Sequence, residues 1–342
     1  MASNLGEKGG VLLNPNPPID GVGVAAPSNS FSEFRRLAEE MKAGNVSVLM
    51  VKDADVYYGM TDTVDMKVAL DRVPLIVSFG GMMDDTTSIA DLILPQHHFL
   101  EDWGTDVPLA GPGYQMIGFQ QPVVRPFFEH RGSNLGTKGF ADILMATAQV
   151  MGKDLKLDGE TFKEVIRNDA KRLYELNRGK IVSNSFEGFW NGVLQRGGWW
   201  DTDSKKQPPM KMSAPKAPAK ANMPSYSSAG EDYPYHMIPF PSISLMDGRG
   251  ANLPWLQATP DPLTTVTWKT WVELNPKTAS SLNVSEGDII RVTSSQGSVE
   301  SPVYIHPATP PNIISIPFGQ GHTSFGSYAE DRGENVFSIL AP

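Results

Sequence analysis

Apolar positions in the first half of the chain switch repeatedly between helical and strand spacing. In residues 31–44 they recur every three or four positions, behind Ser30 or Ser32 as a cap and before Gly44 as a stop, so we predict a helix there. The next apolar run, residues 45–53, is short and uninterrupted, as in a buried strand. The chain therefore begins its regular structure with a helix and then a strand.

The same alternation continues for about forty residues. We predict helices near 62–73 and 84–90 and strands at 74–80 and 91–95. Strands and helices in this order favour a Rossmann-like α/β fold with a parallel sheet. Ligands of such sheets bind beyond the carboxyl ends of the strands, which here are residues 52–55, 78–81 and 95–98.

The second half of the chain has a different pattern. After predicted helices at 139–152 and 161–176, residues 205–229 are rich in Pro, Lys and Ser and read as a linker or surface insertion. Short strands then follow in 264–276, 288–305 and 312–321, with a helix and a Gly287 turn between the first two, which suggests a compact β-barrel. The expected division is a lead-in at 1–30, an α/β region at 31–200, a linker at 201–254 and a barrel at 255–342.

Composition narrows the functional classes. The net charge of -9 and the scattered lysines argue against nucleic acid as a partner. The sequence has neither the ~18 consecutive apolar residues that cross a bilayer nor an N-terminal targeting signal. Cysteine is absent, which excludes thiolate nucleophiles and cysteine-ligated iron–sulfur clusters or zinc within these 342 residues.

Four metal-ligating side chains lie close together after the predicted third strand. His97 and His98 are followed by Glu101 and Asp102. If the strand continues through the histidines, they point to opposite faces and cannot share one mononuclear site without a sharp turn. From the residues alone two interpretations stay open: a metal site and a polar loop after a strand.

Two ordered stretches carry a family resemblance. Residues 271–340 hold an Asn-Pro, an Ala-x-x-Leu, a Gly-Asp, strands around a Gly turn and a closing Gly-x-Gly-His. Residues 73–104 hold a strand, Thr-x-x-x-Ala-Asp, a Leu-Pro, and a Leu-Glu followed by Gly. Together they resemble the second half of molybdopterin oxidoreductases of the dimethyl sulfoxide reductase superfamily. Within this superfamily, the sequence looks closest to the molybdopterin-like subunit of alternative complex III, a bacterial quinol-oxidising complex, and to menaquinone reductase relatives.

The resemblance implies a fold, a cofactor and a set of site residues. The C-terminal region would be a double-psi-type β-barrel, and the family's cofactor would be molybdopterin guanine dinucleotide. The positions that would border it are Asp91, Glu101, Gly104, Gln320, Gly321, His322 and Thr323. No position here matches the family's iron–sulfur or molybdenum ligands, so we expect a fragment, a split gene product or an excised domain pair.

One departure from the family pattern affects the expected cofactor. Catalytic relatives end the first strand with a Gly-x-Asn-Pro turn, whereas this chain has Lys52, Asp53, Ala54 and Asp55. Carboxylates beside a phosphate repel it unless they are neutralised, although an aspartate can also accept hydrogen bonds from guanine. The expectation is therefore no cofactor in this chain, with molybdopterin guanine dinucleotide as the alternative. We expect no metal in this chain either.

The resemblance also implies a cellular role. The chain would be a structural, redox-silent part of a membrane-associated quinol-oxidising complex, peripheral on the periplasmic face of a bacterial cytoplasmic membrane. Its partners would be an iron–sulfur subunit or domain, a multihaem cytochrome c and polytopic membrane subunits, with the clusters and haems on those chains. The alternative is half of a catalytic molybdopterin guanine dinucleotide enzyme that another polypeptide completes, so whether the chain takes part in catalysis is open.

Overall fold

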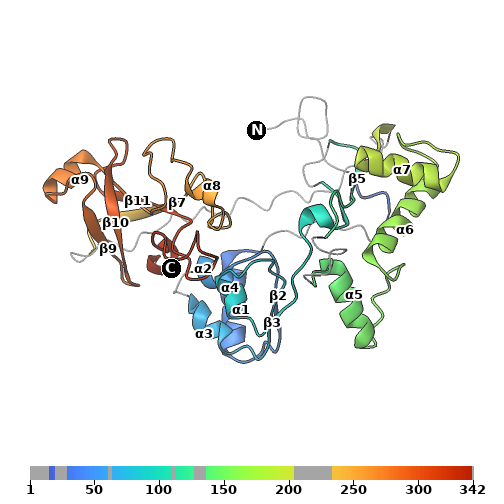
Figure 1. The fold of residues 1–342 in the computed structure, drawn as a ribbon, viewed down its shortest axis with the longest axis horizontal. Coiled ribbons are helices and arrows are strands. Elements are labelled where there is room, and N and C mark those ends of the chain that lie inside the picture. Colours follow the sequence, from blue (N-terminus) through green and yellow to red (C-terminus); the bar gives the residue numbers. More distant parts are fainter. Residues whose placement is uncertain are drawn as a thin grey trace, which may run out of the picture. The chain divides into compact units, whose positions relative to one another are not determined.

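The structure is a computed structural model that describes residues 15–19, 29–60, 64–108, 112–126, 136–203 and 233–340 (Figure 1). The chain forms two compact units. Unit 1 combines Met1–Ser28 with Pro95–Lys220, and unit 2 combines Asn29–Leu94 with Ala221–Pro342. The predicted lead-in, 1–30, lies mostly outside the described residues, and residues 204–232 of the predicted linker, 201–254, lie entirely outside them. The four-part division of the sequence therefore stays a prediction.

The first part of unit 2 is a small α/β layer. Its elements are α1 (Phe31–Lys42), β1 (Leu49–Val51), α2 (Val56–Gly59), α3 (Met66–Leu70), β2 (Ile76–Ser78), α4 (Asp85–Ser88) and β3 (Leu92–Ile93). The three strands form one sheet in the order β1-β2-β3, and both pairings are parallel. The prediction of a parallel sheet with alternating helices is confirmed, with each element shorter than expected.

Local chemistry explains where α1 begins and ends. Ser30 and Glu33 form a reciprocal capping box that satisfies free backbone N–H groups of the first turn. The helix stops before Gly44, whose φ of 76° is a conformation that favours glycine. The buried face of α1, with Ala38 and Met41, packs on α3 and β2 in one hydrophobic cluster. The predicted helix and its serine cap are confirmed.

The second part of unit 2 is a mixed sheet. Its elements are β7 (His236–Pro241), α8 (Pro254–Gln257), β8 (Val272–Leu274), α9 (Pro276–Ser281), β9 (Ile289–Thr293), β10 (Ser298–Ile305), β11 (Ile313–Phe318) and the 3-10 helix η4 (Val336–Ile339). The strand order is β7-β11-β8-β10-β9, and β9 and β10 form an antiparallel hairpin. Among the described pairings the sheet is open, with β7 and β9 at its edges.

Unit 1 has an antiparallel sheet and three longer helices. Its elements are the 3-10 helix η2 (Phe99–Glu101), β4 (Gly104–Asp106), β5 (Gln115–Gln120), α5 (Phe140–Val150), α6 (Phe162–Glu175), α7 (Phe186–Arg196) and β6 (Gly198–Asp201). The strand order is β4-β5-β6. Its core joins Ile117, Leu173, Phe189 and Trp199, all almost fully buried, from β5, α6, α7 and β6. The predicted helices α5 and α6 are confirmed.

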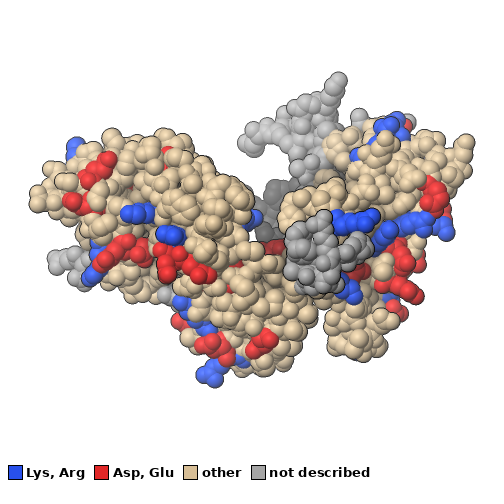
Figure 2. All heavy atoms as spheres, viewed as in Figure 1, with Lys and Arg blue, Asp and Glu red and all other residues tan. Residues whose placement is uncertain are grey.

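The structure also gives two general properties of the chain. None of the helices in the described ranges is long and apolar enough to cross a membrane. On the face shown in Figure 2, acidic and basic side chains lie close to one another on both units. Both signs of charge are therefore present on that face of each unit.

Candidate functional site

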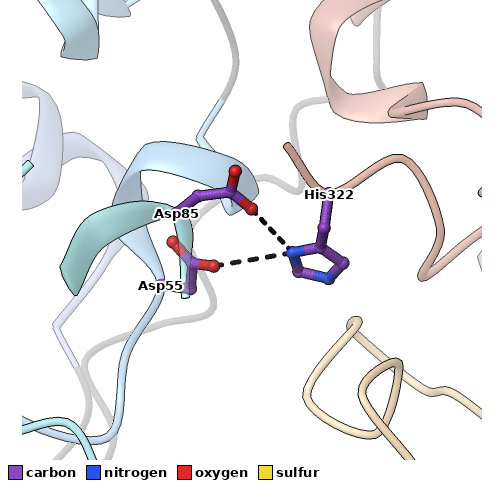
Figure 3. A group of neighbouring side chains, drawn as sticks. All are labelled: Asp55, Asp85 and His322. Carbon is purple, nitrogen blue, oxygen red and sulfur yellow. Dashed lines mark hydrogen bonds and ion pairs between the residues drawn. The ribbon is translucent and has the colours of Figure 1, made fainter. Parts of the chain in front are cut away.

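Two carboxylates and one histidine converge in unit 2 (Figure 3). Asp55 follows β1 and caps α2, Asp85 opens α4 after β2, and His322 lies in the loop after β11. Since β1 and β2 are parallel neighbours, their carboxyl ends bring both aspartates to the same edge of the sheet. The Nδ1 atom of His322 lies 2.7 Å from Oδ2 of Asp85 and 3.7 Å from Oδ2 of Asp55. We call these three residues the carboxylate–histidine cluster.

Asp85 is the buried anchor of this cluster. Its Oδ2 atom meets His322, and its Oδ1 atom accepts hydrogen bonds from the backbone N–H groups of Thr323 and Ser324, both at 2.9 Å, and from the Thr323 hydroxyl. Burial alone would raise the pKa of Asp85, but the hydrogen bonds from His322 and Thr323 outweigh it and hold that pKa below its ordinary value. Asp85 is therefore a charged group that fastens the 322–324 loop to α4.

Asp55 is held in a similar way but with one oxygen left over. Its Oδ1 atom accepts from the N–H and hydroxyl of Thr86, at 3.0 and 2.6 Å, and from the Tyr58 N–H at 3.3 Å. Its Oδ2 atom is buried and has no hydrogen-bond partner. Burial raises the pKa of Asp55, and the charges of Asp84 and Asp85 raise it further. One carboxylate oxygen of the cluster is therefore buried without a hydrogen-bond donor.

His322 is enclosed on its remaining sides. The ring of Tyr58 stacks on the imidazole with centroids 3.7 Å apart, and the Tyr58 hydroxyl donates to the Gln320 carbonyl at 2.8 Å. On another side, a Cβ added to Gly248 would lie 2.6 Å from His322 Nε2, so only glycine fits there. The His322 side chain is 2% exposed, and its Nε2 atom has no hydrogen-bond partner.

The rest of the predicted cofactor loop is also turned inward. Gln320 is buried and exchanges two amide hydrogen bonds with Gln257, at 2.7 and 3.1 Å. Gly321 has a φ of 88°, and an added Cβ would lie 2.0 Å from the backbone N of Asn335. The cavity beside Gln320 and Gln257 measures about 20 Å³, which is room for about one water molecule. The space around the 319–323 loop is thus occupied by the chain's own groups.

The other predicted positions serve local structure. Asp91 accepts the Ile76 N–H at 2.7 Å, which ties β3 to the start of β2. Glu101 closes a capping box with His98 at η2, and Gly104 opens β4. Asp91 belongs to unit 2 with the 320–323 loop, whereas Glu101 and Gly104 belong to unit 1. Their role toward a cofactor stays a prediction.

The two adjacent histidines have separate partners. His97 pairs through Nδ1 with the Thr137 hydroxyl at 2.9 Å, while His98 Nδ1 accepts the Leu100 N–H at 3.3 Å. His97, Glu101 and Asp102 line a hollow of about 450 Å³ in unit 1. Within the described ranges, the group with metal-ligand geometry is the carboxylate–histidine cluster and not this quartet.

The sequence analysis did not predict Asp85 as a site residue, and it did not predict that Asp55 lies beside Asp85 and His322. Both aspartates lie at predicted strand ends or in the helix after one, so the parallel-sheet prediction was the signal that could have joined them. His322 was named from the family pattern, but its partners were not. The reason is that 237 residues separate His322 from Asp85.

Two segments of the chain match known families. Residues 15–134 match the family described as Molybdopterin oxidoreductase, and residues 258–337 match the Molydopterin dinucleotide binding domain. The chain therefore carries domains of the molybdopterin oxidoreductase superfamily. These two matches fall in the same regions and order as the two stretches identified from the sequence.

Two relatives are similar to this chain over most of its length. The chain is similar to the molybdopterin-binding-like subunit of menaquinone reductase from Nitratidesulfovibrio vulgaris, with 24% identity over 88% of this chain and 40% of that protein. It is also similar to the molybdopterin-containing subunit of arsenate respiratory reductase from Chrysiogenes arsenatis, with 25% identity over 81% of this chain and 40% of that protein. The chain thus spans about 40% of the length of these relatives.

A solved structure shows the same fold. Acetylene hydratase from Pelobacter acetylenicus matches 89% of this chain and 42% of its own, with a TM-score of 0.57 and 16% identity. At that identity the likeness concerns the fold alone.

Proposed function

We propose that this chain is a structural, redox-silent molybdopterin-oxidoreductase-like part of a respiratory quinol-oxidising complex of the alternative complex III type. The single observation that carries the redox-silent role is the inward packing of the 319–323 loop against the chain's own side chains. Gln320 and His322 are buried against Gln257, Tyr58 and Asp85, so both side chains already have partners within the chain. A cofactor that bound through these two side chains would have to displace those contacts.

Charge at the strand end supports the same proposal. Asp53 and Asp55 follow β1, at the edge where nucleotides bind in sheets of this kind. Asp55 Oδ2 is already buried near His322 and Asp84, so a phosphate there would meet repulsion. The strand end is therefore unsuited to the phosphates of a dinucleotide.

The name of one relative supports the assembly. The menaquinone reductase relative is called a molybdopterin-binding-like subunit. By analogy we propose iron–sulfur, multihaem cytochrome c and polytopic membrane subunits as partners, with this chain peripheral on the periplasmic face of the membrane. Since the chain has no cysteine, iron–sulfur clusters would be held elsewhere in the complex. We also propose that the C-terminal sheet closes into the double-psi-type β-barrel of the family.

A second function is favoured by other relatives. The arsenate respiratory reductase relative is called molybdopterin-containing, and residues 258–337 match a dinucleotide binding domain. In that case the chain would be the C-terminal half of a catalytic subunit, and Asp91, Glu101, Gly104, Gln320, Gly321, His322 and Thr323 would border the cofactor.

Cofactor content separates the two functions. The native assembly should be purified, and its molybdenum, tungsten and acid-released guanine nucleotide should be quantified per copy of this chain. The redox-silent proposal expects none of the three in stoichiometric amount. About one molybdenum or tungsten per chain together with guanine nucleotide would overturn it in favour of the enzyme.

A further inference from the structure

We propose that Asp55, Asp85 and His322 bind one divalent transition-metal cation in unit 2, which links the α/β layer to the loop after β11. The three candidate ligand atoms lie within 4.8 Å of one another. This inference goes beyond the proposed function, because it holds or fails whatever the redox role of the chain.

The donor atoms converge in the way that metal ligands do. Oδ2 of Asp85 and Oδ2 of Asp55 lie 2.7 and 3.7 Å from the same nitrogen, His322 Nδ1. Ligands about 2.0–2.2 Å from a zinc ion stand about 3–3.5 Å from one another, so small shifts would place all three around one ion. The direct contact between His322 and Asp85 would then be replaced by two bonds to the cation.

Each carboxylate is oriented by hydrogen bonds that its Oδ1 atom accepts. Oδ1 of Asp85 accepts the N–H groups of Thr323 and Ser324, and Oδ1 of Asp55 accepts from Thr86. Both carboxylates therefore use one oxygen for structure and turn the other toward His322. Hydrogen bonds of this kind fix the direction of ligands in metal sites.

An unsatisfied atom points to a missing partner. Asp55 Oδ2 is fully buried, has no hydrogen-bond partner and faces the His322 nitrogen. Leaving such an oxygen bare costs free energy, and a cation would remove that cost. Asp84 and Asp85 add negative charge around Asp55, so the field at this point favours a cation.

The donor set indicates the kind of metal. One imidazole nitrogen and two carboxylate oxygens suit Zn²⁺, Mn²⁺ or Fe²⁺, whereas Mg²⁺ prefers oxygen ligands alone. With Nδ1 bound to the ion, the imidazole proton would reside on Nε2, which packs against Gly248. Three protein ligands would leave further coordination positions for water.

The first test measures binding by the full 342-residue chain. After treatment with EDTA and dialysis, the chain is titrated with Zn²⁺, Mn²⁺ or Mg²⁺, and bound metal and the thermal midpoint are recorded. We expect one Zn²⁺ or Mn²⁺ per chain and a midpoint about 5 °C higher at about a hundredfold excess over Kd, with no such effect of Mg²⁺. Substoichiometric metal with an unchanged midpoint would overturn the proposal.

The second test uses a change whose effect has opposite signs with and without metal. Asp55→Asn keeps an acceptor for Thr86 but removes the buried charge. In EDTA the thermal midpoint of the variant should be higher than that of the native chain. With Zn²⁺ present the midpoint of the variant should be lower than that of the native chain, and the variant should bind Zn²⁺ at least about tenfold more weakly. Asp53→Asn is the matched control, because Asp53 is nearby, exposed and outside the cluster. The proposal fails if Asp55→Asn and Asp53→Asn bind zinc equally well.

Discussion

His322 Nδ1 lies 2.7 Å from Asp85 Oδ2, although the two residues are 237 positions apart in the chain. Both side chains are 2% exposed, so the contact is sealed from water. It joins the start of α4 to the loop after β11 and thereby fastens the α/β layer to the C-terminal sheet. In this chain the Gly-x-Gly-His loop holds the α/β layer and the C-terminal sheet together.

Removing the imidazole should destabilise the chain strongly. In EDTA, His322→Ala should lower the free energy of unfolding by about 3 kcal/mol, because it leaves Asp85 buried without its partner and Tyr58 without its stacked ring. Urea denaturation of the full chain measures the change. His98→Asn is the control, since His98 is exposed and asparagine also caps helices, and it should stay within about 0.5 kcal/mol. Equal effects of the two substitutions would contradict the buried contact.

Two glycines of one loop region should differ in their tolerance of a methyl group. Gly321→Ala places a Cβ 2.0 Å from the Asn335 backbone N, whereas Gly326→Ala meets nothing within 4 Å. Both glycines have positive φ, so both substitutions carry a backbone cost of about 1 kcal/mol. We expect Gly321→Ala to cost at least about 2 kcal/mol more, measured by thermal or chemical denaturation. Similar losses would contradict the close packing of Gly321 against Asn335.

Asp85 should make part of the stability dependent on acid. Its folded-state pKa lies below the ordinary value of 3.8, so its charged form stabilises the fold above that pH, and this contribution is lost as the pH falls through the lower folded pKa. In EDTA, Asp85→Asn should therefore be much less stable than the native chain at about pH 6, and the gap should narrow below about pH 3.8. Urea midpoints across this range test it, and a gap independent of pH would contradict it.

Asp55 should act in the opposite direction in the same experiment. Its folded-state pKa is raised, so any stability it contributes is present below the unfolded pKa of 3.8 and is lost as the pH rises through the higher folded value. In metal-free chain, Asp55→Asn should gain over the native chain toward neutral pH. Gains of the same size in acid and at neutral pH would show that relief of the buried charge is not the cause.

Local signals in the sequence predicted most elements of the α/β layer. The Ser30 cap and Gly44 stop of α1 are set by neighbouring residues, so sequence reasoning could find them. Strand β7 was not predicted, because Pro239 and Pro241 interrupt its pattern. Proline is tolerated there because β7 lies at the edge of its sheet. Helix α7 was also missed, since its glycines, at 188 and 192, weaken a helical pattern.

The candidate site was less accessible from sequence. The parallel strands could have placed Asp55 near Asp85, because both follow carboxyl ends at one edge. Nothing local indicates that His322 folds back on them under Tyr58, since that contact depends on how two distant layers pack. The family pattern singled out His322, and the packing adds its contacts with Asp85 and Tyr58.

The most direct test of the account is the intact mass of this chain, released from its native assembly and measured by native mass spectrometry. The account predicts the polypeptide mass plus one divalent cation, with that cation removed by EDTA and no dinucleotide adduct. A species heavier by a molybdopterin guanine dinucleotide would contradict the account, because the loop that holds His322 would then have opened to admit the cofactor.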